Sequence, residues 1–146
     1  MTGRPTAPRA VLAYGLLGVI PFWSVAIAAR LAPDWTGVAA AIEAVYAAMI
    51  LSFLGGARWG LAVRDASPNP VVVGLAMTPT LVGLAILVLT HGEMRVQCLA
   101  LAAALTLSWA WDVGARDLPA WYGRFRNVLT LGAVGGLCVG AMQVPR

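Results

Sequence analysis

Lysine is absent from this chain of 146 residues, and charge of either sign is scarce. Charged residues make up 11% of the sequence, whereas an ordinary soluble domain carries about 25%. All ten basic residues are arginines, and the six acidic residues leave a formal net charge of +4. So few charges are typical of a chain that faces little water. The 60% share of hydrophobic residues and the mean hydropathy of +0.82 indicate a membrane protein.

The chain also lacks the usual motifs of enzymes and metal sites. Its two cysteines, Cys98 and Cys138, lie in different apolar segments without metal-ligand spacing, so we interpret them as packing residues. His91 is the only histidine, and GxSxG, HExxH and Walker A sequences are absent. We therefore expect no metal, no cofactor and no enzymatic activity.

Five apolar runs are each long enough to cross the hydrocarbon core of a bilayer, which takes about 20 helical residues. They cover about residues 10–30, 35–59, 70–90, 95–115 and 127–145. Short connections predict antiparallel neighbours, so the expected fold is an all-α integral membrane protein. We expect one domain over residues 1–146, a compact bundle of five transmembrane helices. The first run exceeds a typical signal-peptide core, so we interpret it as a retained helix.

The arginines are distributed unevenly between the two ends of these spans. Seven fall on the side of the N-terminus, namely Arg4, Arg9, Arg58, Arg64, Arg116, Arg124 and Arg126. Three fall on the opposite side, namely Arg30, Arg95 and Arg146. The positive-inside rule then predicts a cytoplasmic N-terminus and an external C-terminus. Because the arginines separate apolar runs, we expect them to face the lipid bilayer's surface and do not expect nucleic acid as a partner.

Glu43 is an ionisable residue about two turns inside the second span. A charged residue at the centre of a membrane helix costs about 2.5–3.5 kcal/mol on insertion scales, so a compensating role is expected. Glu43 is either a proton or cation site or the acceptor of a hydrogen bond between helices, and we favour the structural role. Tyr46 follows three residues later and can share its helix face.

Arg58 and Asp112 form a second candidate constellation. In the predicted topology both lie at the cytoplasmic depth, on the second and fourth spans. An ion pair between them would offset two desolvation costs and fix the register of two helices. A headgroup or substrate site is the alternative. Arg116, one turn beyond Asp112, is expected to compete for the same carboxylate.

Small residues mark the expected close contacts between helices. The glycines are Gly55, Gly56 and Gly60 in the second span and Gly132, Gly136 and Gly140 in the last. The last three form a tandem GxxxG repeat, for which we favour packing inside the bundle over dimerisation. Pro21 and Pro79 fall near the middles of the first and third spans and predict kinks, which we favour over breaks that line a binding site, as in transporters.

The stretch ILSFLGGARWG, residues 50–60, resembles the signature of an uncharacterised membrane family, domain of unknown function 3429, the transmembrane protein 69-like proteins. That signature is LSFLGG followed by a Trp-Gly pair, as Ser52, Trp59 and Gly60 stand here. A second family motif precedes the last helix and matches Pro119, Trp121, Tyr122, Arg124, Arg126, Leu129 and Thr130. The resemblance implies a five-helix protein of the bacterial inner membrane or its mitochondrial counterpart, and it implies no activity.

Three functions remain open on the sequence. We favour a non-catalytic bundle that supports a membrane complex, with either a membrane-protein partner or further copies of the chain beside it. The alternative is a small transporter or a proton or ion pathway that uses Glu43. A third hypothesis is a lipid-modifying enzyme at the cytoplasmic face, built on Asp112, Asp117, Arg124 and Arg126.

Overall fold

Helices make up the regular structure of the described chain, residues 7–114 and 118–144 of the computed structural model. In chain order they are α1 (Arg9–Leu17), the 3-10 helix η1 (Ile20–Trp23), α2 (Ser24–Leu31), the 3-10 helix η2 (Pro33–Trp35), α3 (Thr36–Ala62), α4 (Pro70–Leu89), α5 (Met94–Gly114) and α6 (Ala120–Gln143). Four charged residues considered above lie outside the described residues: Arg4, Arg116, Asp117 and Arg146.

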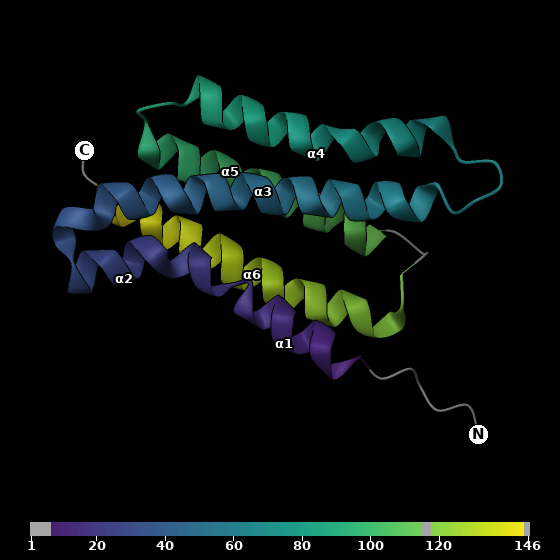
Figure 1. Ribbon diagram of the computed structural model, residues 1–146, viewed down its shortest axis with the longest axis horizontal. Coiled ribbons are helices and arrows are strands. Elements are labelled where there is room, and N and C mark those ends of the chain that lie inside the picture. Colours follow the sequence, from purple (N-terminus) through teal and green to yellow (C-terminus); the bar gives the residue numbers. More distant parts are fainter. Residues whose placement is uncertain (1–6, 115–117, 145–146) are drawn as a thin grey trace.

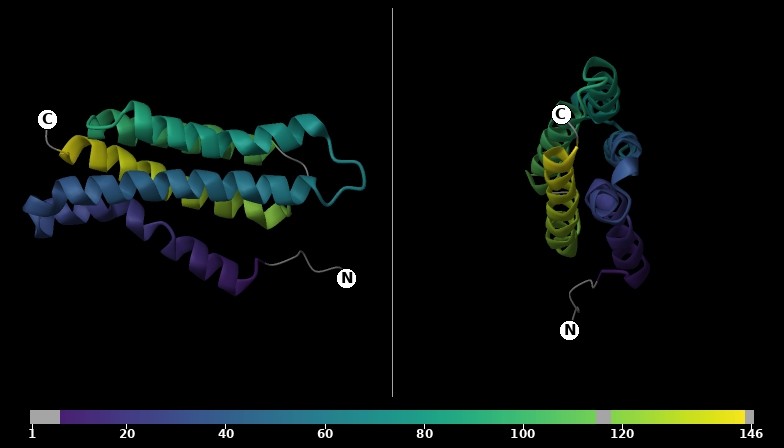
Figure 2. Two further views of the ribbon diagram at one scale, coloured as in Figure 1. Left: turned by 45° about the horizontal axis from the view of Figure 1, so that its top comes forward. Right: turned by 90° about the vertical axis from the view of Figure 1, so that its left-hand side faces the viewer.

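Five helical segments are long and apolar enough to cross a membrane, which confirms the predicted all-α class with five spans. They are Arg9–Leu31, Pro33–Ala62, Pro70–Leu89, Met94–Gly114 and Trp121–Gln143. Successive spans run in opposite directions, so α1 begins at one end of the bundle and α6 ends at the other (Figure 1). Seen end-on, α5 and α6 lie side by side next to a row formed by the first span, α3 and α4 (Figure 2).

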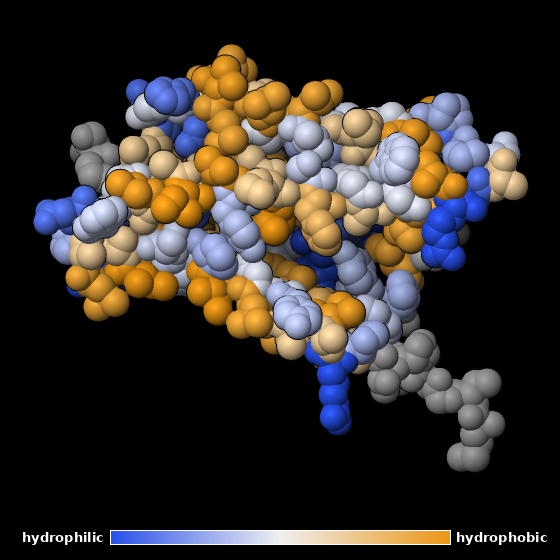
Figure 3. Space-filling model, in the orientation of Figure 1, coloured by the Kyte–Doolittle hydropathy of each residue, from blue (hydrophilic) through white to orange (hydrophobic). Residues whose placement is uncertain are grey.

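The core between α3, α5 and α6 consists mainly of alanine and leucine side chains. Leu51, Leu101 and Leu137 are among its fully buried members. Many outward-facing side chains are also apolar, among them Leu89, which is 82% exposed, and Leu131, which is 74% exposed. Hydrophobic residues accordingly cover much of the outer surface in Figure 3. A helix bundle that is apolar outside as well as inside fits a lipid surrounding, where packing and polar contacts hold the helices together.

The first span is interrupted rather than kinked, which corrects the expectation for Pro21. Helix α1 ends at Leu17, the 3-10 turn η1 carries Pro21, and α2 starts at Ser24. Proline has no N–H to donate and its ring crowds the preceding turn, so the α-helical hydrogen bonds cannot run through this point. Helix α1 therefore diverges from the line of α2 and from α3 (Figure 2).

The tandem GxxxG face of α6 packs against this interruption. A Cβ atom added at Gly132 would lie 2.6 Å from Cγ1 of Val19, and one at Gly136 would overlap the carbonyl oxygen of Phe22. One added at Gly140 would lie 3.2 Å from Oε1 of Glu43. The missing side chains let α6 approach the irregular backbone of the first span, so these glycines serve contacts inside the chain.

Helix α4 continues through Pro79 and packs closely on α3. The hydroxyl of Thr78 donates to the carbonyl oxygen of Leu75 at 2.7 Å, which is the carbonyl that the missing N–H of Pro79 leaves free. A Cβ added at Gly55 would lie 2.5 Å from the carbonyl oxygen of Ala76. Gly55 therefore permits the contact at this proline.

The close contact expected at Gly56 and Gly60 is not made within the described bundle. A Cβ added at either position would meet nothing within 4 Å. Gly55 and Gly56 are adjacent, so only one of them can face α4. The run of glycines in the sequence therefore contains one packing position and two open ones.

Replacing Gly136 with alanine is expected to destabilise the bundle, because the new methyl group would overlap the backbone of Phe22. Overpacking of this kind costs about 1–3 kcal/mol. Gly135→Ala is the matched control, since its Cβ would have an ordinary contact of 3.8 Å with Trp23. Thermal unfolding in detergent, followed by circular dichroism, compares the two variants. Equal melting temperatures would contradict the packing described here.

Candidate functional site: two polar clusters between the helices

Glu43 lies on α3 beside the residue at which α2 begins, and it is fully buried. Its Oε2 accepts hydrogen bonds from the backbone N–H of Val25 at 3.2 Å and from the hydroxyl of Ser24 at 3.5 Å. Both residues belong to the first turn of α2, whose N–H groups have no acceptor within their own helix. A carboxylate is also favoured at the positive end of a helix dipole. Glu43 therefore caps α2 from a neighbouring helix.

Tyr46 contacts the other side of the same interruption, where α1 ends. Its hydroxyl donates to the carbonyl oxygen of Gly18 at 2.8 Å, immediately after the end of α1. Its ring meets the ring of Phe22 edge to face, with centroids 5.2 Å apart. Glu43 and Tyr46, three residues apart on α3, thus hold the two broken ends of the first span. The polar pair proposed from the sequence lies together at one place, which we call the break cluster (Glu43, Tyr46, Ser24 and the backbone of Gly18 and Val25).

One oxygen of the break cluster is left without a hydrogen bond. Oε1 of Glu43 is buried and has no partner among the described residues. It lies beside Gly140, where a Cβ would come within 3.2 Å of it. A buried carboxylate oxygen without a donor is costly, so this atom is the one feature of the cluster that helix capping does not account for.

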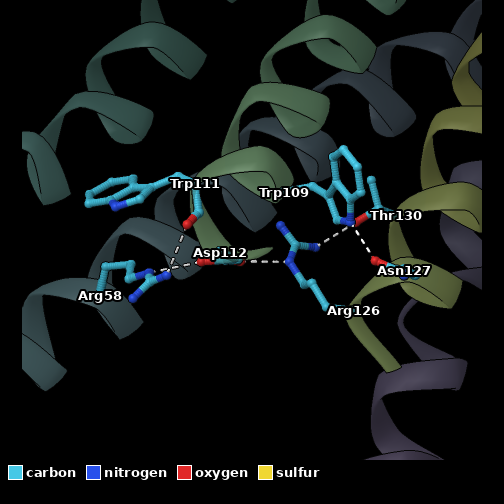
Figure 4. Close-up of polar contacts among 7 residues, drawn as sticks. All are labelled: Arg58, Trp109, Trp111, Asp112, Arg126, Asn127 and Thr130. Carbon is cyan, nitrogen blue, oxygen red and sulfur yellow. Dashed lines mark hydrogen bonds and ion pairs between the residues drawn. The ribbon is translucent and has the colours of Figure 1, made fainter. Parts of the chain in front are cut away.

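Asp112 of α5 forms a second cluster by bridging two arginines from two other helices (Figure 4). Its Oδ1 accepts from Nε of Arg58 at 2.8 Å, and its Oδ2 accepts from Nε of Arg126 at 2.7 Å. The three side chains are at least nine-tenths buried. The structure thus brings Arg58 and Asp112 together and adds Arg126 of α6 as a second partner. We call these three residues the arginine bridge.

Further contacts hold the two guanidinium groups of the arginine bridge in place. Nη1 of Arg126 donates to the hydroxyl of Thr130 at 3.0 Å, and Nη2 of Arg58 donates to the carbonyl oxygen of Trp111 at 3.4 Å. The guanidinium of Arg58 also lies 5.4 Å from the centre of the Trp111 ring, within cation–π range. These charge-assisted bonds offset part of the loss of hydration of the buried groups. Nη2 of Arg126 is buried without a hydrogen-bond partner among the described residues.

The sequence placed Arg126 at the cytoplasmic face, in a family motif and in the hypothetical lipid-modifying site, but not inside a helix, because the last span was predicted to start at about 127. Helix α6 begins at Ala120, so Arg126 lies in its second turn and faces inward. Arg126 and Thr130 stand four residues apart, followed by buried Ala133 and Leu137. That helical spacing is the signal that would have extended the span back to Arg126.

The two family motifs meet at the arginine bridge. Arg58 lies inside the first motif and Arg126 inside the second, and Asp112 joins them. Pro119 is the N-cap residue of α6. The rings of Trp121 and Tyr122 meet edge to face, with centroids 5.9 Å apart. Trp59, near the end of α3, is 44% exposed. Ser52 lies further inside the bundle and accepts a hydrogen bond from Thr80 of α4 at 3.0 Å.

The ion pairs of the arginine bridge link three helices to one another. Both oxygens of Asp112 are occupied by guanidinium N–H groups, which leaves the carboxylate poorly placed to act as a base. A small cavity of about 180 Å³ lies beside it and is lined by Asp112, Tyr122 and Arg126, among others. Over residues 7–114 and 118–144, no three histidine, cysteine or acidic residues are grouped so that they could hold a metal ion.

Replacing Asp112 with asparagine is expected to lower the free energy of unfolding by about 3–5 kcal/mol, because two buried arginines lose their shared counter-ion. Asp34→Asn removes an exposed acid of the same type and is the control, with little change expected. Unfolding by SDS in mixed micelles, monitored by circular dichroism, gives both values. A wild-type midpoint for Asp112→Asn would refute the bridge.

Capping by Glu43 is tested by two substitutions that both remove its ionisable carboxyl group. Glu43→Gln keeps a carbonyl oxygen that can accept from Val25, whereas Glu43→Leu leaves the N–H of Val25 unpaired in the bundle. We expect the leucine variant to be less stable than the glutamine variant by about 1–3 kcal/mol. The same SDS titration measures the difference. A leucine variant as stable as the glutamine variant would mean that the contact caps nothing.

Comparisons with known proteins agree with these features. A family model described as "Protein of unknown function (DUF3429)" matches residues 7–142. Transmembrane protein 69 of Xenopus tropicalis is 32% identical over 134 residues, which are 90% of this chain and 53% of the frog protein. Transmembrane protein 69 of Mus musculus is 35% identical over 78 residues, which are 51% of this chain and 32% of the mouse protein.

The chain thus matches about half of the frog protein and a third of the mouse protein. No solved structure matches it significantly. The family model covers nearly the whole chain, and the five spans fit it. The chain is a polytopic membrane protein that belongs to the DUF3429 family and is similar to transmembrane protein 69.

Proposed function

We propose that this protein is a non-catalytic, multi-pass bundle of the bacterial inner (cytoplasmic) membrane that supports the assembly of a membrane complex. The observation behind the proposal is the use of its intramembrane polar groups. The break cluster ties α3 to both halves of the first span, and the arginine bridge ties α3, α5 and α6 together. These groups are engaged in holding helices at fixed positions, which suits a scaffold.

The two clusters are separated by an apolar stretch of α3. Glu43 and Arg58 stand 15 residues apart (58 − 43), about 22 Å along the helix at 1.5 Å per residue. Every buried α3 residue between them is apolar, as in Ala47, Leu51 and Leu54. Along this helix no chain of polar side chains joins the two clusters, which favours a structural role over a path across the membrane.

The orientation follows from the charges at the two ends of the helices. The start of α1, the end of α3 and the start of α6 lie at one end of the bundle (Figure 1). By the bounds of these helices, five described arginines belong to that end: Arg9, Arg58, Arg64, Arg124 and Arg126. Arg30 and Arg95 lie at the other end. By the positive-inside rule, we place the start of α1 and the arginine bridge on the cytoplasmic side.

A transporter or a proton or ion pathway through Glu43 is the second candidate. It is favoured by the free Oε1 of Glu43 and by the interrupted first span, since broken helices often form binding sites in transporters. This function requires flux in proteoliposomes that Glu43→Gln abolishes while the variant still folds.

The scaffold proposal is tested by purifying the tagged protein from its own membrane in a gentle detergent and quantifying what accompanies it by mass spectrometry. We expect a stoichiometric membrane partner, and we expect deletion of this chain to lower the abundance of that partner's assembled complex. The same membrane without the tagged chain is the control. Recovery of the protein alone, or only with itself, would contradict the scaffold and favour transport.

A further inference from the structure

A cavity of about 420 Å³ lies between the end of α3 and the start of α4. Its polar lining consists of Arg58, Arg64, Asp65 and Asn69, and its apolar lining includes Leu61 and Val72. The cavity lies where one potential span ends, at Ala62, and the next begins, at Pro70. In a bilayer this is the depth of the lipid headgroups.

The lining offers donors and positive charge that the fold itself does not use. The side chain of Arg64 is exposed and forms no hydrogen bond or ion pair with the described part of the chain. Asn69 accepts from the N–H of Val71 at 2.9 Å through its side-chain oxygen, so it caps α4 while its amide nitrogen has no acceptor among the described residues. Two arginines against Asp65 leave the lining with a net positive charge.

Arg58 gives the cavity a fixed cationic wall. It is more than nine-tenths buried, and the arginine bridge holds its guanidinium in one position. The cavity also lies at the N-terminus of α4, a 20-residue helix whose dipole favours an anion. Pro70 has no N–H there and the N–H of Val71 is bonded to Asn69, so the helix contributes its dipole and not these two donors. A buried cation, an exposed arginine and a helix N-terminus therefore surround one space that is large enough to hold a phosphodiester group.

We propose that this cavity binds the phosphate of an anionic phospholipid. Arginine pairs with phosphate through two parallel hydrogen bonds, and basic pockets between membrane helices recognise acidic headgroups. Leu61 and Val72 provide an apolar edge for the glycerol and upper acyl carbons. Inorganic phosphate shares the ionic chemistry but does not use this edge. The proposal is independent of the scaffold function, since it rests on the cavity alone.

The test is native mass spectrometry of the full chain released from detergent micelles that contain equal amounts of phosphatidylglycerol and phosphatidylcholine. We expect the wild type to retain phosphatidylglycerol in preference to phosphatidylcholine. Arg64→Gln should weaken this retention about fivefold, the effect of one arginine at a membrane surface. Arg124→Gln is the matched control, because it removes an exposed arginine at the same end that lines neither cavity.

A second variant separates binding from folding. Asn69→Asp keeps a side-chain oxygen that can cap α4 but replaces the amide donor with a negative charge. It should lose phosphatidylglycerol and keep its wild-type circular dichroism. Equal retention of the two lipids, or loss in Arg124→Gln as large as in Arg64→Gln, would overturn the site. Binding of inorganic phosphate with the same dependence on Arg64 would overturn the assignment to a lipid.

Discussion

Inside a bilayer no water is at hand to satisfy a backbone N–H or C=O, and each group left alone costs several kcal/mol. The architecture of this protein follows from that constraint, because its first span is broken. Where α1 ends and α2 begins, backbone groups lose their helical partners. Glu43 and Tyr46 of α3 supply replacements, and the glycine face of α6 closes over the same segment. Burying Glu43 in the membrane is unfavourable, but its side chain pairs a backbone N–H group that the break would otherwise leave without a hydrogen bond.

The arginine bridge meets a related requirement near one end of the bundle. Lipid provides no hydrophobic driving force for helices to associate, so close packing and polar contacts must fix their positions. Asp112 links α5 to both α3 and α6, which sets the depth of three helices at once. The arginine bridge joins the two rows of helices at one end, and the break cluster ties the first span to α3 within one row. The core of alanine and leucine side chains between them contributes close packing.

Apolar runs in the sequence predicted the spans, and two sequence motifs predicted the family. The pairing of Arg58 with Asp112 followed from the equal depth of the two residues in the predicted topology. The sequence patterns did not predict the break at Pro21, since a proline gives the same local signal for a kink and for an interruption. Pro79 shows the difference: Thr78 satisfies the freed carbonyl there, and α4 continues. Whether a helix breaks depends on partners such as Glu43 that a neighbouring helix brings.

Arg126 was missed for a different reason. When a span is predicted from its run of uncharged residues, it begins only after the last arginine before that run. A buried arginine in the first turns of the helix is then assigned to the loop. Only the inward face shared by Arg126, Thr130 and Leu137 reveals that the helix has already begun. Similarly, Gly55 and Gly56 look alike in the sequence, and the rotation of α3 alone decides which of them meets α4.

The most direct measurement of the central claim is the backbone amide signal of Val25 in isotope-labelled protein in a lipid nanodisc. The capping contact predicts a downfield amide proton, typical of a bond to a side-chain carboxyl group, that moves strongly upfield in Glu43→Leu, which removes the acceptor. The amide of Ala28, one turn further along α2, should stay in place. A Val25 signal that does not respond to the substitution would show that Glu43 does not cap the broken span.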